Sequence, residues 1–572
     1  MDNGKQVAKR ICVSPKGLNK LLKGGLVLPP SENGLIVLIK GRPGTGKTTL
    51  ALQIASEATK LENFKSNNEI NLKSIFYSCE QSKQDIEERM KDLGGEKNIE
   101  INGIDSCDAR RSTDYSPCSA TEPLLICIDE HVKKLEGEGN VKSVVFDGLN
   151  LLASEERSIV EISRLVRILR ARSVIGILIY DEGADEYSPT DFMADMVIEM
   201  KSEQASPTIN YQLLKLSITK SRFQSTGIGW HQYKSKKDGI HVYPSIHFRA
   251  SELGEKVANN AEEKKKDNSI SEHDPKNPSS TTLSIIESLI GAEHFQRESG
   301  SSTVLLGARR TMKTDVSIDF LRSISSDTSD QKSTGLLISL LDNQGSIEEQ
   351  TKMFCRPTRV STNGNERDSE ECSKHMLPPQ YFRPGFIAPD EFFHLIEQRF
   401  LETFDNQKNE DGICSSCIKR VVFWDLTQLE YRFPLLVEEK VFLPLLFDFL
   451  KNAGSSLEED ASPAVNSLFI GAPNTEFGKI AAAMADNVIF SWHDQRKIND
   501  RKENGVAFFV DRIQGKPGRG GLYFIPNDDK DQYDRKPNLA EAIDEITEWE
   551  ALKNANDMIC RVESLQGLSS LP

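Results

Sequence analysis

A stretch near the N-terminus has the residue types and spacing of a phosphate-binding loop. Residues 41–49 read Gly-Arg-Pro-Gly-Thr-Gly-Lys-Thr-Thr, which fits the pattern Gly-x-x-x-x-Gly-Lys-Thr. The glycines let the backbone curl so that successive N–H groups point inward at a phosphate chain. Lys47 is expected to reach the β- and γ-phosphates of ATP, and the Thr48 hydroxyl is expected to hold Mg²⁺. The candidate nucleotide-binding residues are Gly41, Pro43, Gly44, Thr45, Gly46, Lys47, Thr48 and Thr49.

Two carboxylates stand directly after β-rich runs, where they could act on the same phosphates. Glu80 follows the run at residues 74–79, and Asp147 follows the run at residues 143–146. A carboxylate at the end of a strand beside the loop can activate the water that attacks the γ-phosphate, so Glu80 is the candidate base. Asp147 stands where a Walker B carboxylate would hold Mg²⁺ through water. These residue types predict a site that hydrolyses ATP with Mg²⁺.

The elements that must position these residues alternate between strand and helix. An apolar run at residues 35–39 precedes the loop, and a helix-like segment begins near Leu50. An amphipathic segment at residues 155–172 precedes the apolar run 174–180, and residues 195–199 have the pattern of another strand. This alternation predicts an α/β fold with a mostly parallel sheet for the first half.

The order of these motifs resembles the KaiC branch of the RecA ATPases. The resemblance spans nearly all of the first 245 residues and rests on residues 41–49, 78–81, 144–147, 192–198, 220–222 and 238–244. It implies a RecA-like core, a homo-oligomeric ring of about six subunits and nucleotide held between neighbours. Lys220 and Arg222 match the family's Lys-x-Arg pair, which reaches into the adjacent subunit's site and stabilises charge on the transferring phosphoryl group. The alternative is that both are ordinary strand-end cations that face water.

The second half repeats this plan with losses. Residues 303–306 lead into residues 307–314, which occupy the frame of a second phosphate-binding loop and keep its Lys and Thr. Arg310 and Met312 replace two of the glycines. We expect the Met312 side chain to crowd the approach to the phosphates, and the β-carbon of Arg310 to restrict the loop torsions.

Further aligned positions also separate the two halves chemically. Leu341 aligns with Glu80, so the candidate base is missing from the second half. Asp425 ends a strand-like run and is interpreted as a Walker B-like acid. The positions aligned with Arg222 and Lys220 are Arg512 and Val510, respectively. We interpret the second half as a RecA-like domain that has lost hydrolysis, and whether it still binds nucleotide stays open.

The predicted architecture is α/β, with two tandem RecA-like P-loop domains, each a mostly parallel twisted sheet flanked by helices. Its expected parts are a domain at residues 1–254, a linker at 255–282, a degenerate domain at 283–537 and a helical tail at 538–572. The linker is charged and has almost no apolar residues, which is typical of a solvated spacer. The tail has apolar residues among acids, which predicts an amphipathic helix that packs on the body or on a protein partner.

The resemblance to KaiC raises the question of self-phosphorylation. The family's Ser-Thr acceptor pair lies just before the strand that begins here at residue 485, and Ala482 and Ala483 stand in that place. Neither alanine has a hydroxyl that could accept a phosphoryl group. We therefore expect no clock-type phosphorylation cycle.

Two Cys and His pairs lie in an insertion of the second half. Cys372 and His375 are spaced Cys-x-x-His, and Cys414 and Cys417 are spaced Cys-x-x-Cys. This spacing suits a tetrahedral zinc site. The pairs are far apart in the sequence, and the alternative is an ordinary Cys-x-x-Cys turn with an unrelated histidine.

The composition bounds the class of protein. The 572 residues, 38% hydrophobic and 27% charged, predict more than one globular domain. The longest apolar stretch, residues 173–180, is too short to span a bilayer, and the ten irregularly spaced cysteines fit reduced thiols, so we expect a cytoplasmic protein without membrane contact. The net charge of −15 argues against a broad nucleic-acid surface.

The sequence therefore favours an oligomeric ATPase whose first domain hydrolyses ATP and whose second domain is regulatory or binds a protein partner. One alternative is a DNA-dependent motor or recombination factor, because residues 220–223, Lys-Ser-Arg-Phe, are also similar to the Lys-Asn-Arg-Phe stretch of the RadA branch. That branch has a Gly at the next position, where this chain has Gln224. A third hypothesis is a nucleotide-gated scaffold with negligible turnover.

Overall fold

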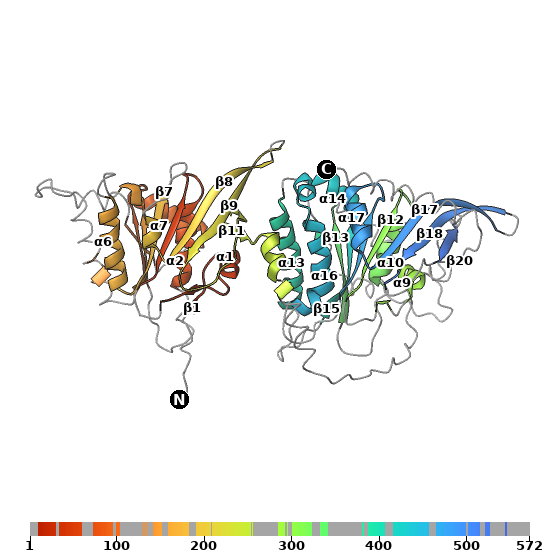
Figure 1. Ribbon diagram of the computed structural model, residues 1–572, viewed down its shortest axis with the longest axis horizontal. Coiled ribbons are helices and arrows are strands. Elements are labelled where there is room, and N and C mark those ends of the chain that lie inside the picture. Colours follow the sequence, from red (N-terminus) through yellow and green to blue (C-terminus); the bar gives the residue numbers. More distant parts are fainter. Residues whose placement is uncertain are drawn as a thin grey trace, which may run out of the picture. The chain divides into compact units, whose positions relative to one another are not determined.

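The chain forms two compact units, Met1–Arg249 and Ala250–Pro572, each built on an α/β sheet (Figure 1). The computed structural model describes residues 10–29, 34–59, 73–94, 99–102, 129, 132–133, 141–151, 158–181, 190–206, 209–252, 254–255, 284–291, 294–295, 300–322, 332–340, 380–381, 387–405, 416–456, 465–498, 501–514, 521–526 and 544–545. The predicted linker at 255–282 lies outside these residues except for position 255.

In the described part of the first unit, a nine-stranded sheet has the order β11-β10-β9-β8-β3-β7-β6-β4-β5. The strands from β8 to β5 in this order run parallel, and β9, β10 and β11 extend the sheet in antiparallel fashion. The strand bounds are β3 (Ile36–Gly41), β4 (Lys73–Ser78), β5 (Ile99–Asn102), β6 (Val141–Asp147), β7 (Ile175–Asp181), β8 (Met196–Ser206), β9 (Ile209–Ser221), β10 (His231–Lys236) and β11 (Gly239–Tyr243). Because β3, β4, β6 and β7 are parallel, their carboxyl ends lie along one edge of the sheet.

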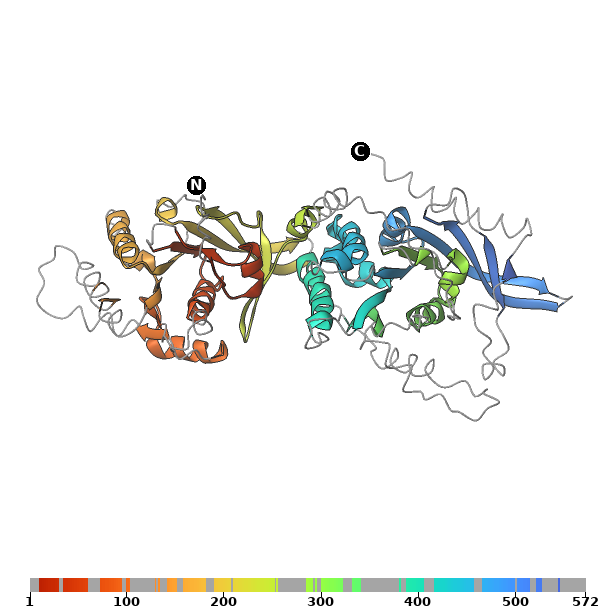
Figure 2. The same cartoon turned by 90° about the horizontal axis from the view of Figure 1, so that it is seen from below.

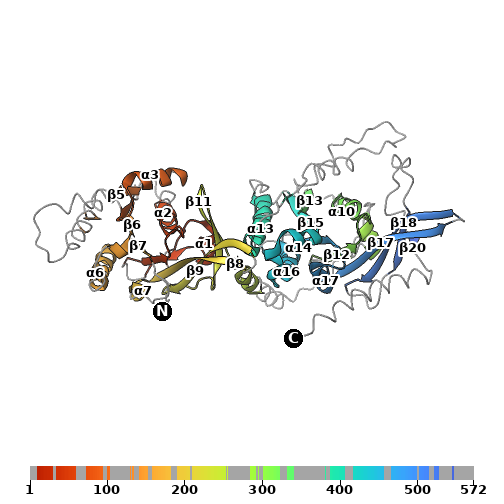
Figure 3. The same ribbon diagram turned by 90° about the horizontal axis from the view of Figure 1, so that it is seen from above.

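Helices cover both faces of this sheet. Their bounds are α1 (Lys16–Leu21), α2 (Lys47–Ala58), α3 (Lys83–Asp92), α6 (Ser158–Ala171) and α7 (Thr190–Met193), with a 3-10 turn η1 (Leu149–Leu151). Figure 3 shows α2 and α3 on one face and α6 and α7 on the other. A two-stranded ribbon of β1 (Arg10–Ile11) and β2 (Leu26–Val27) lies outside the main sheet.

The central strand β3 is apolar from Ile36 to Ile39 because it is covered on both faces. Val37 and Ile39 belong to a core cluster with Leu50 of α2, whereas Leu38 belongs to a second cluster with Leu165 of α6. Alternate side chains of a strand point to opposite faces, so one continuous apolar run supplies two cores. This packing fixes the strand that leads into the phosphate-binding loop.

The second unit repeats the same strand order. Its described sheet runs β14-β13-β15-β16-β12-β17-β18-β19-β20, which is the order of the first unit read from β5 to β11. The strand bounds are β12 (Ser302–Gly307), β13 (Lys332–Ser339), β14 (Gln380–Tyr381), β15 (Ser416–Trp424), β16 (Asn466–Gly471), β17 (Asn487–Ile498), β18 (Arg501–Arg512), β19 (Leu522–Pro526) and β20 (Asp544–Glu545). Figure 2 shows β17 and β18 in blue as a long two-stranded ribbon. Two sheet regions with one topology fit the predicted tandem RecA-like architecture.

The helices of the second unit enclose an aromatic core on one face of its sheet. Their bounds are α9 (Ile285–Ile290), α10 (Lys313–Arg322), α13 (Pro389–Asp405), α14 (Leu426–Arg432), α15 (Pro434–Glu438), α16 (Phe442–Ser456) and α17 (Glu476–Met484). Phe447 of α16 stacks on Phe469 of β16 with ring centroids 4.0 Å apart, and Phe392 of α13 contacts Phe442 edge to face at 5.4 Å. These large rings bind α13 and α16 to the sheet.

The C-terminal tail differs from its prediction where the structure describes it. A helix was expected over residues 538–572, but Asp544–Glu545 form strand β20, which pairs with Tyr523 and Phe524 of β19. The free edge of β19 offers N–H and C=O groups that a neighbouring segment can pair with, and this pairing overrides the helical pattern. The remainder of the tail lies outside the described residues.

Candidate functional site

The loop between β3 and α2 has the left-handed torsions that its glycines permit. Gly44 has φ 82° and Gly46 has φ 86°. The Thr45 hydroxyl donates a hydrogen bond to the Arg42 carbonyl (2.8 Å), and the Tyr233 hydroxyl of β10 donates one to the Thr45 carbonyl (2.5 Å). Burial raises the pKa of Tyr233, which keeps this hydroxyl a donor. The other loop candidates, Gly41, Pro43, Thr48 and Thr49, lie at the end of β3, in the exposed loop and in the first turn of α2.

Lys47 is a buried cation with one partner in the loop and one at the end of the adjacent strand β7. Its Nζ donates a hydrogen bond to the Arg42 carbonyl (2.9 Å) and lies 2.5 Å from Oδ1 of Asp181. The Lys47 side chain is 7% exposed and the Asp181 side chain is 28% exposed. A buried ammonium needs such partners because its removal from water is costly.

Thr48 and Asp147, the two predicted Mg²⁺ ligands, lie within hydrogen-bonding distance of each other. The Thr48 hydroxyl donates a hydrogen bond to Oδ2 of Asp147 (3.0 Å), although the two residues come from α2 and β6. Asp147 is 1% exposed, and burial raises its pKa although the hydrogen bond from Thr48 lowers it. A hydroxyl and a carboxylate oxygen are the kind of hard donors that Mg²⁺ prefers, so this pair fits a Mg²⁺ site.

Glu80 lies beside the same acids. Burial, followed by the negative charges of Asp147 and Asp181, raises the pKa of Glu80 to about 7, whereas Lys47 opposes the shift. Gly148, directly after Asp147, has φ 90°, and a β-carbon there would lie 3.1 Å from Cγ of Glu80. The glycine therefore makes room for the predicted base.

Asp181 is a member of this cluster that the sequence analysis missed. It ends β7 and is paired in register with Gly41, the first residue of the loop. Asn150 holds its backbone from both sides, because the Asn150 amide donates to the Asp181 carbonyl (2.5 Å) and the Asp181 N–H donates to Oδ1 of Asn150 (2.8 Å). Its position at the end of the apolar run 174–180 was the available signal, since Glu80 and Asp147 were found by the same feature.

Lys220 and Arg222 lie together at the end of β9, around the α7–β8 connection. The Lys220 ammonium donates to the Asp191 carbonyl (2.5 Å) and the Phe192 carbonyl (3.3 Å). Arg222 donates to the Phe192 carbonyl (2.8 Å) and to Oδ1 of Asp195 (3.2 Å). Burial, with the charge of Arg222, lowers the pKa of Lys220. These contacts lie within one chain, and the role of the pair toward a neighbour stays a prediction.

The geometry therefore brings the residues predicted to bind phosphate and metal to one edge of the first sheet. The family model described as "ATPase: KaiC" matches residues 14–247, which is nearly the whole of this unit. The first unit is thus similar to the KaiC-like ATPase domains, and we refer to it below as the KaiC-like domain. A search of curated proteins found no match to the chain.

The second loop keeps the left-handed torsions of the loop in the KaiC-like domain, although two of the glycines are replaced. Arg310 has φ 63° and Met312 has φ 54°, at the positions of Gly44 and Gly46. The β-carbon of Arg310 was expected to restrict these torsions, and the structure shows that the left-handed conformation is retained. Side chains at such φ values cost free energy, so the surrounding fold must impose the conformation.

Strand register places Asp425 one residue beyond the level of Asp147, although the charge of Asp425 still acts on Lys313. Ser78 pairs with Asp147 in the KaiC-like domain, and Ser339 pairs with Trp424 in the second unit. Trp424 therefore stands level with the Walker B candidate, and Asp425 follows it. Asp425 caps α14, where its Oδ1 accepts a hydrogen bond from the Thr427 N–H (3.0 Å).

Other members of the KaiC-like cluster also lack a counterpart in the described part of the second unit. Gly471 pairs with Leu306, so Ala472 stands at the level of Asp181. Lys313 correspondingly donates to the Gly307 carbonyl (2.8 Å) and the Gly471 carbonyl (3.3 Å). Leu341, expected opposite Glu80, lies outside the described residues.

Register also corrects the alignment of the strand-end cations. Val197 pairs with Lys220, and Val488 pairs with Arg512, so Arg512 corresponds to Lys220 and not to Arg222. Arg512 accordingly donates to the Ala482 carbonyl (2.5 Å), just as Lys220 donates to a carbonyl before β8. An alignment of the sequences matches Arg512 to Arg222 by residue type, whereas the strand partner of each residue shows which positions are equivalent in the two sheets.

The predicted zinc site falls largely outside the part of the chain that the structure describes. Cys372, His375 and Cys414 lie outside it, and of Cys417 only the backbone in β15 is described. Within the described residues, no group of three or more His, Cys, Asp or Glu side chains could hold a metal ion. None of the described helices is long and apolar enough to cross a membrane.

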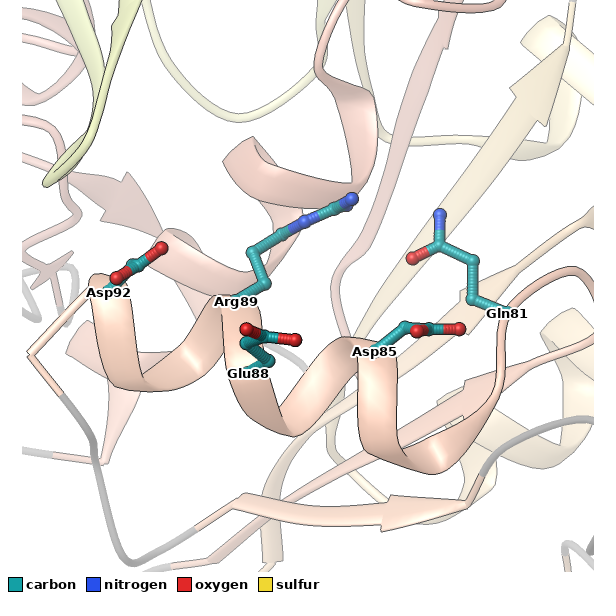
Figure 4. A pocket seen from close by; sticks show the side chains of 5 residues that line it. All are labelled: Gln81, Asp85, Glu88, Arg89 and Asp92. Atoms are coloured by element: carbon teal, nitrogen blue, oxygen red, sulfur yellow. The ribbon is translucent and has the colours of Figure 1, made fainter.

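A shallow pocket of about 440 Å³ lies along α3, directly after Glu80. It is lined by Gln81, Asp85, Glu88, Arg89 and Asp92 (Figure 4). Figure 4 shows the Arg89 guanidinium and the Gln81 amide turned toward the same side. The charge of Arg89 acts on the Walker B candidate and lowers its pKa, although burial outweighs this effect. The pocket therefore borders the nucleotide site of the KaiC-like domain.

Proposed function

We propose that this chain is an ATPase whose first unit binds and hydrolyses ATP, and whose second unit regulates the first or binds a protein partner. The observation that carries the proposal is the convergence of Lys47, the Thr48–Asp147 pair and Glu80 at one edge of the first sheet. A phosphate-binding cation, two oxygen donors for Mg²⁺ and a carboxylate with a raised pKa are the groups that phosphoryl transfer to water needs.

Each group has one part in the proposed reaction. Lys47 and the loop N–H groups bind the β- and γ-phosphates, and Thr48 and Asp147 hold Mg²⁺, which neutralises phosphate charge when it is bound. Glu80 orients the attacking water and accepts its proton. A pKa of about 7 suits this role, because the group is substantially ionised near neutral pH and remains basic enough to take a proton.

In the described part of the second unit, other residue types stand at the levels of two acids of the first unit. Trp424 and Ala472 stand at the levels of Asp147 and Asp181. The described carboxylate whose charge acts on Lys313 is Asp425, which caps α14 one residue beyond the level of Asp147. This contrast supports a division of labour in which turnover belongs to the first unit.

Assembly into a homo-oligomeric ring of about six subunits is part of the proposal. Lys220 and Arg222 at the end of β9 both donate to the carbonyl of Phe192 in α7, a residue that is 68% exposed. Cations beside an exposed aromatic ring fit a surface that contacts a neighbouring subunit. Ala482 and Ala483 offer no hydroxyl, so the proposed assembly hydrolyses ATP without phosphorylating itself there.

Two variants of the full chain test the catalytic assignment. Lys47→Ala is expected to lose ATP binding and hydrolysis together, because it removes the cation that contacts phosphate. Glu80→Gln is expected to keep ATP binding and to lose turnover by about 100-fold or more, because it removes the base. Glu203→Gln, which changes a carboxylate paired with Lys201 and Lys215 on β8 and β9, serves as the control with normal turnover.

Rates of phosphate release and equilibrium binding of a fluorescent ATP analogue measure these effects. If Glu80→Gln hydrolyses ATP as fast as the wild type, Glu80 is excluded as the base. Binding of ATP without turnover in the wild-type chain would instead favour the scaffold hypothesis.

A further inference from the structure

The ion pair between Lys47 and Asp181 joins the central cation of the loop to a carboxylate outside the loop motif. The 2.5 Å distance from Nζ to Oδ1 is a short charge-assisted contact, and the Lys47 side chain is 7% exposed. The ammonium's other described partner is the Arg42 carbonyl. A phosphate on Lys47 would need the position that the Asp181 carboxylate takes, since both are anions that seek the same ammonium protons.

The position of Asp181 is fixed by the fold. β7 pairs with β3 along its length, and this pairing sets Asp181 beside Gly41 at the mouth of the loop. The two hydrogen bonds with Asn150 hold the Asp181 backbone from the turn η1. The carboxylate is therefore aimed at Lys47 by neighbouring strands and is not carried there by a free loop.

The second unit supplies an internal comparison. Ala472 takes the place of Asp181 there, and Lys313 turns to the carbonyls of Gly307 and Gly471. A P-loop lysine thus reaches a backbone carbonyl in both units. Among the described residues, only the lysine of the first unit forms an ion pair with a carboxylate on the adjacent strand, whereas Lys313 feels the charge of Asp425. Asp181 is therefore not required to build the loop.

We propose that Asp181 acts as a latch on Lys47, that is, an ion-pair partner that competes with nucleotide phosphate for the Lys47 ammonium. This competition sets the nucleotide affinity of the first unit. This inference rests on the proposed ATP-binding function of the first unit. When nucleotide binds, Lys47 exchanges the carboxylate for phosphate oxygens, and the free energy of the broken ion pair is subtracted from binding. Asp181 acts through Lys47 and is a positioning residue.

The test compares equilibrium binding of fluorescently labelled ADP to full-length variants at pH 8, with Mg²⁺ present. Asp181→Asn keeps the side-chain shape and removes the charge, and it is expected to lower Kd by about fivefold to tenfold, the worth of one partly exposed ion pair. Glu80 is hydrogen-bonded to the Asp181 side chain and not to Lys47, and Glu80→Gln keeps a donor for Asp181 while it removes one charge of the cluster. This variant is expected to change Kd by less than about twofold. Glu203→Gln is the control away from the site.

The pair of variants separates the latch from simple repulsion between acids and phosphates. Repulsion alone predicts equal tightening in Asp181→Asn and Glu80→Gln, and that result would overturn the latch. Unchanged or weaker binding by Asp181→Asn, with wild-type binding intact, would also overturn it. Absence of ADP binding by the wild type and by Asp181→Asn alike would defeat the proposed function together with the latch.

The rise in unfolding temperature that ADP causes supplies a readout that a purely structural role would not move. Without nucleotide, Asp181→Asn is expected to unfold at a lower temperature, because Lys47 keeps its buried charge and loses its partner. Saturating ADP is expected to raise the unfolding temperature of this variant by more than it raises that of the wild type. Asp181→Ser removes both carboxylate oxygens and should likewise show a lower unfolding temperature without nucleotide and a larger rise with ADP. An equal rise with ADP in the wild type and both variants would contradict the latch.

Discussion

Tyr233 and Thr45 are 188 residues apart in the sequence, and the Tyr233 hydroxyl donates a hydrogen bond of 2.5 Å to the Thr45 carbonyl. This contact ties the antiparallel extension of the sheet to the phosphate-binding loop. The same extension begins with β9, whose end carries Lys220 and Arg222. The paired strands β9 and β10 therefore connect the cations proposed to face a neighbour with the predicted phosphate-binding loop.

Removal of this hydroxyl is expected to weaken nucleotide binding. Tyr233→Phe keeps the buried ring and loses one hydrogen bond, which should raise the Kd for ATP by about threefold to tenfold, because the loop conformation becomes less favoured. Tyr431→Phe, at a side chain 73% exposed in the second unit, is the matched control and should leave the Kd unchanged. Equal Kd values for all three proteins would show that the loop holds its shape without Tyr233.

The raised pKa of Glu80 predicts an acid limb in the rate profile. The base must be ionised, so kcat/KM for ATP hydrolysis should fall as pH drops through about 7. The residual activity of Glu80→Gln should lack this limb, because the titrating base is gone. An identical limb in the variant would assign the titration to another group, such as the phosphate of ATP itself.

The same shift predicts the pH dependence of stability. The folded-state pKa of Glu80 lies above its ordinary value of 4.5, so the folded protein binds this proton more tightly than the unfolded chain does. The contribution of Glu80 is therefore most favourable below pH 4.5 and is lost as pH rises toward about 7. In denaturant unfolding, Glu80→Gln should become more stable relative to the wild type across this window, and a difference independent of pH would contradict the shift.

Loss of the second lysine should spare turnover. Lys313→Ala is expected to retain most ATP hydrolysis, because the described part of its unit has Trp424 and Ala472 where the first unit has acids. Steady-state phosphate release measures this, with the oligomeric state recorded by light scattering on the same sample. Complete loss of hydrolysis with assembly intact would show that the second loop takes part in turnover.

Completion of the site by a neighbour can be tested by mixing inactive subunits. The double variant Lys220→Ala, Arg222→Ala should be inactive alone, and Glu80→Gln should be nearly so. After subunit exchange at equal ratio, about a quarter of interfaces would pair an intact Glu80 with intact neighbouring cations, so partial activity should return. Exchange is verified first with labelled subunits, and no recovery despite exchange would restrict the cations to their own chain.

Nucleic acid is expected to have little effect on turnover. The net charge of −15 opposes a broad phosphate-binding surface, so single-stranded DNA or RNA at moderate salt should leave the hydrolysis rate nearly unchanged. Stimulation by about tenfold or more would favour the motor hypothesis instead.

The sequence by itself determined the phosphate-binding loop and the α/β plan. The loop is defined by residues within one short stretch, and its torsions follow from glycines whose spacing is visible without any fold. Glu80 and Asp147 were also found, because a carboxylate after an apolar run marks the carboxyl end of a strand, and parallel strands bring such ends to one edge.

Only the tertiary structure decided which residues share a level across the sheet. Asp181 has no local motif, and its role became visible when β7 was paired with β3. Arg512 was matched to Arg222 by residue type, whereas the strand partner of each residue shows that it corresponds to Lys220. Both ribbons have an irregular register near this point, between Val197 and Ile198 and between Val488 and Ile489. A shift of this kind changes which residues face each other while leaving the sequence pattern almost unaltered, so strand pairing had to be observed.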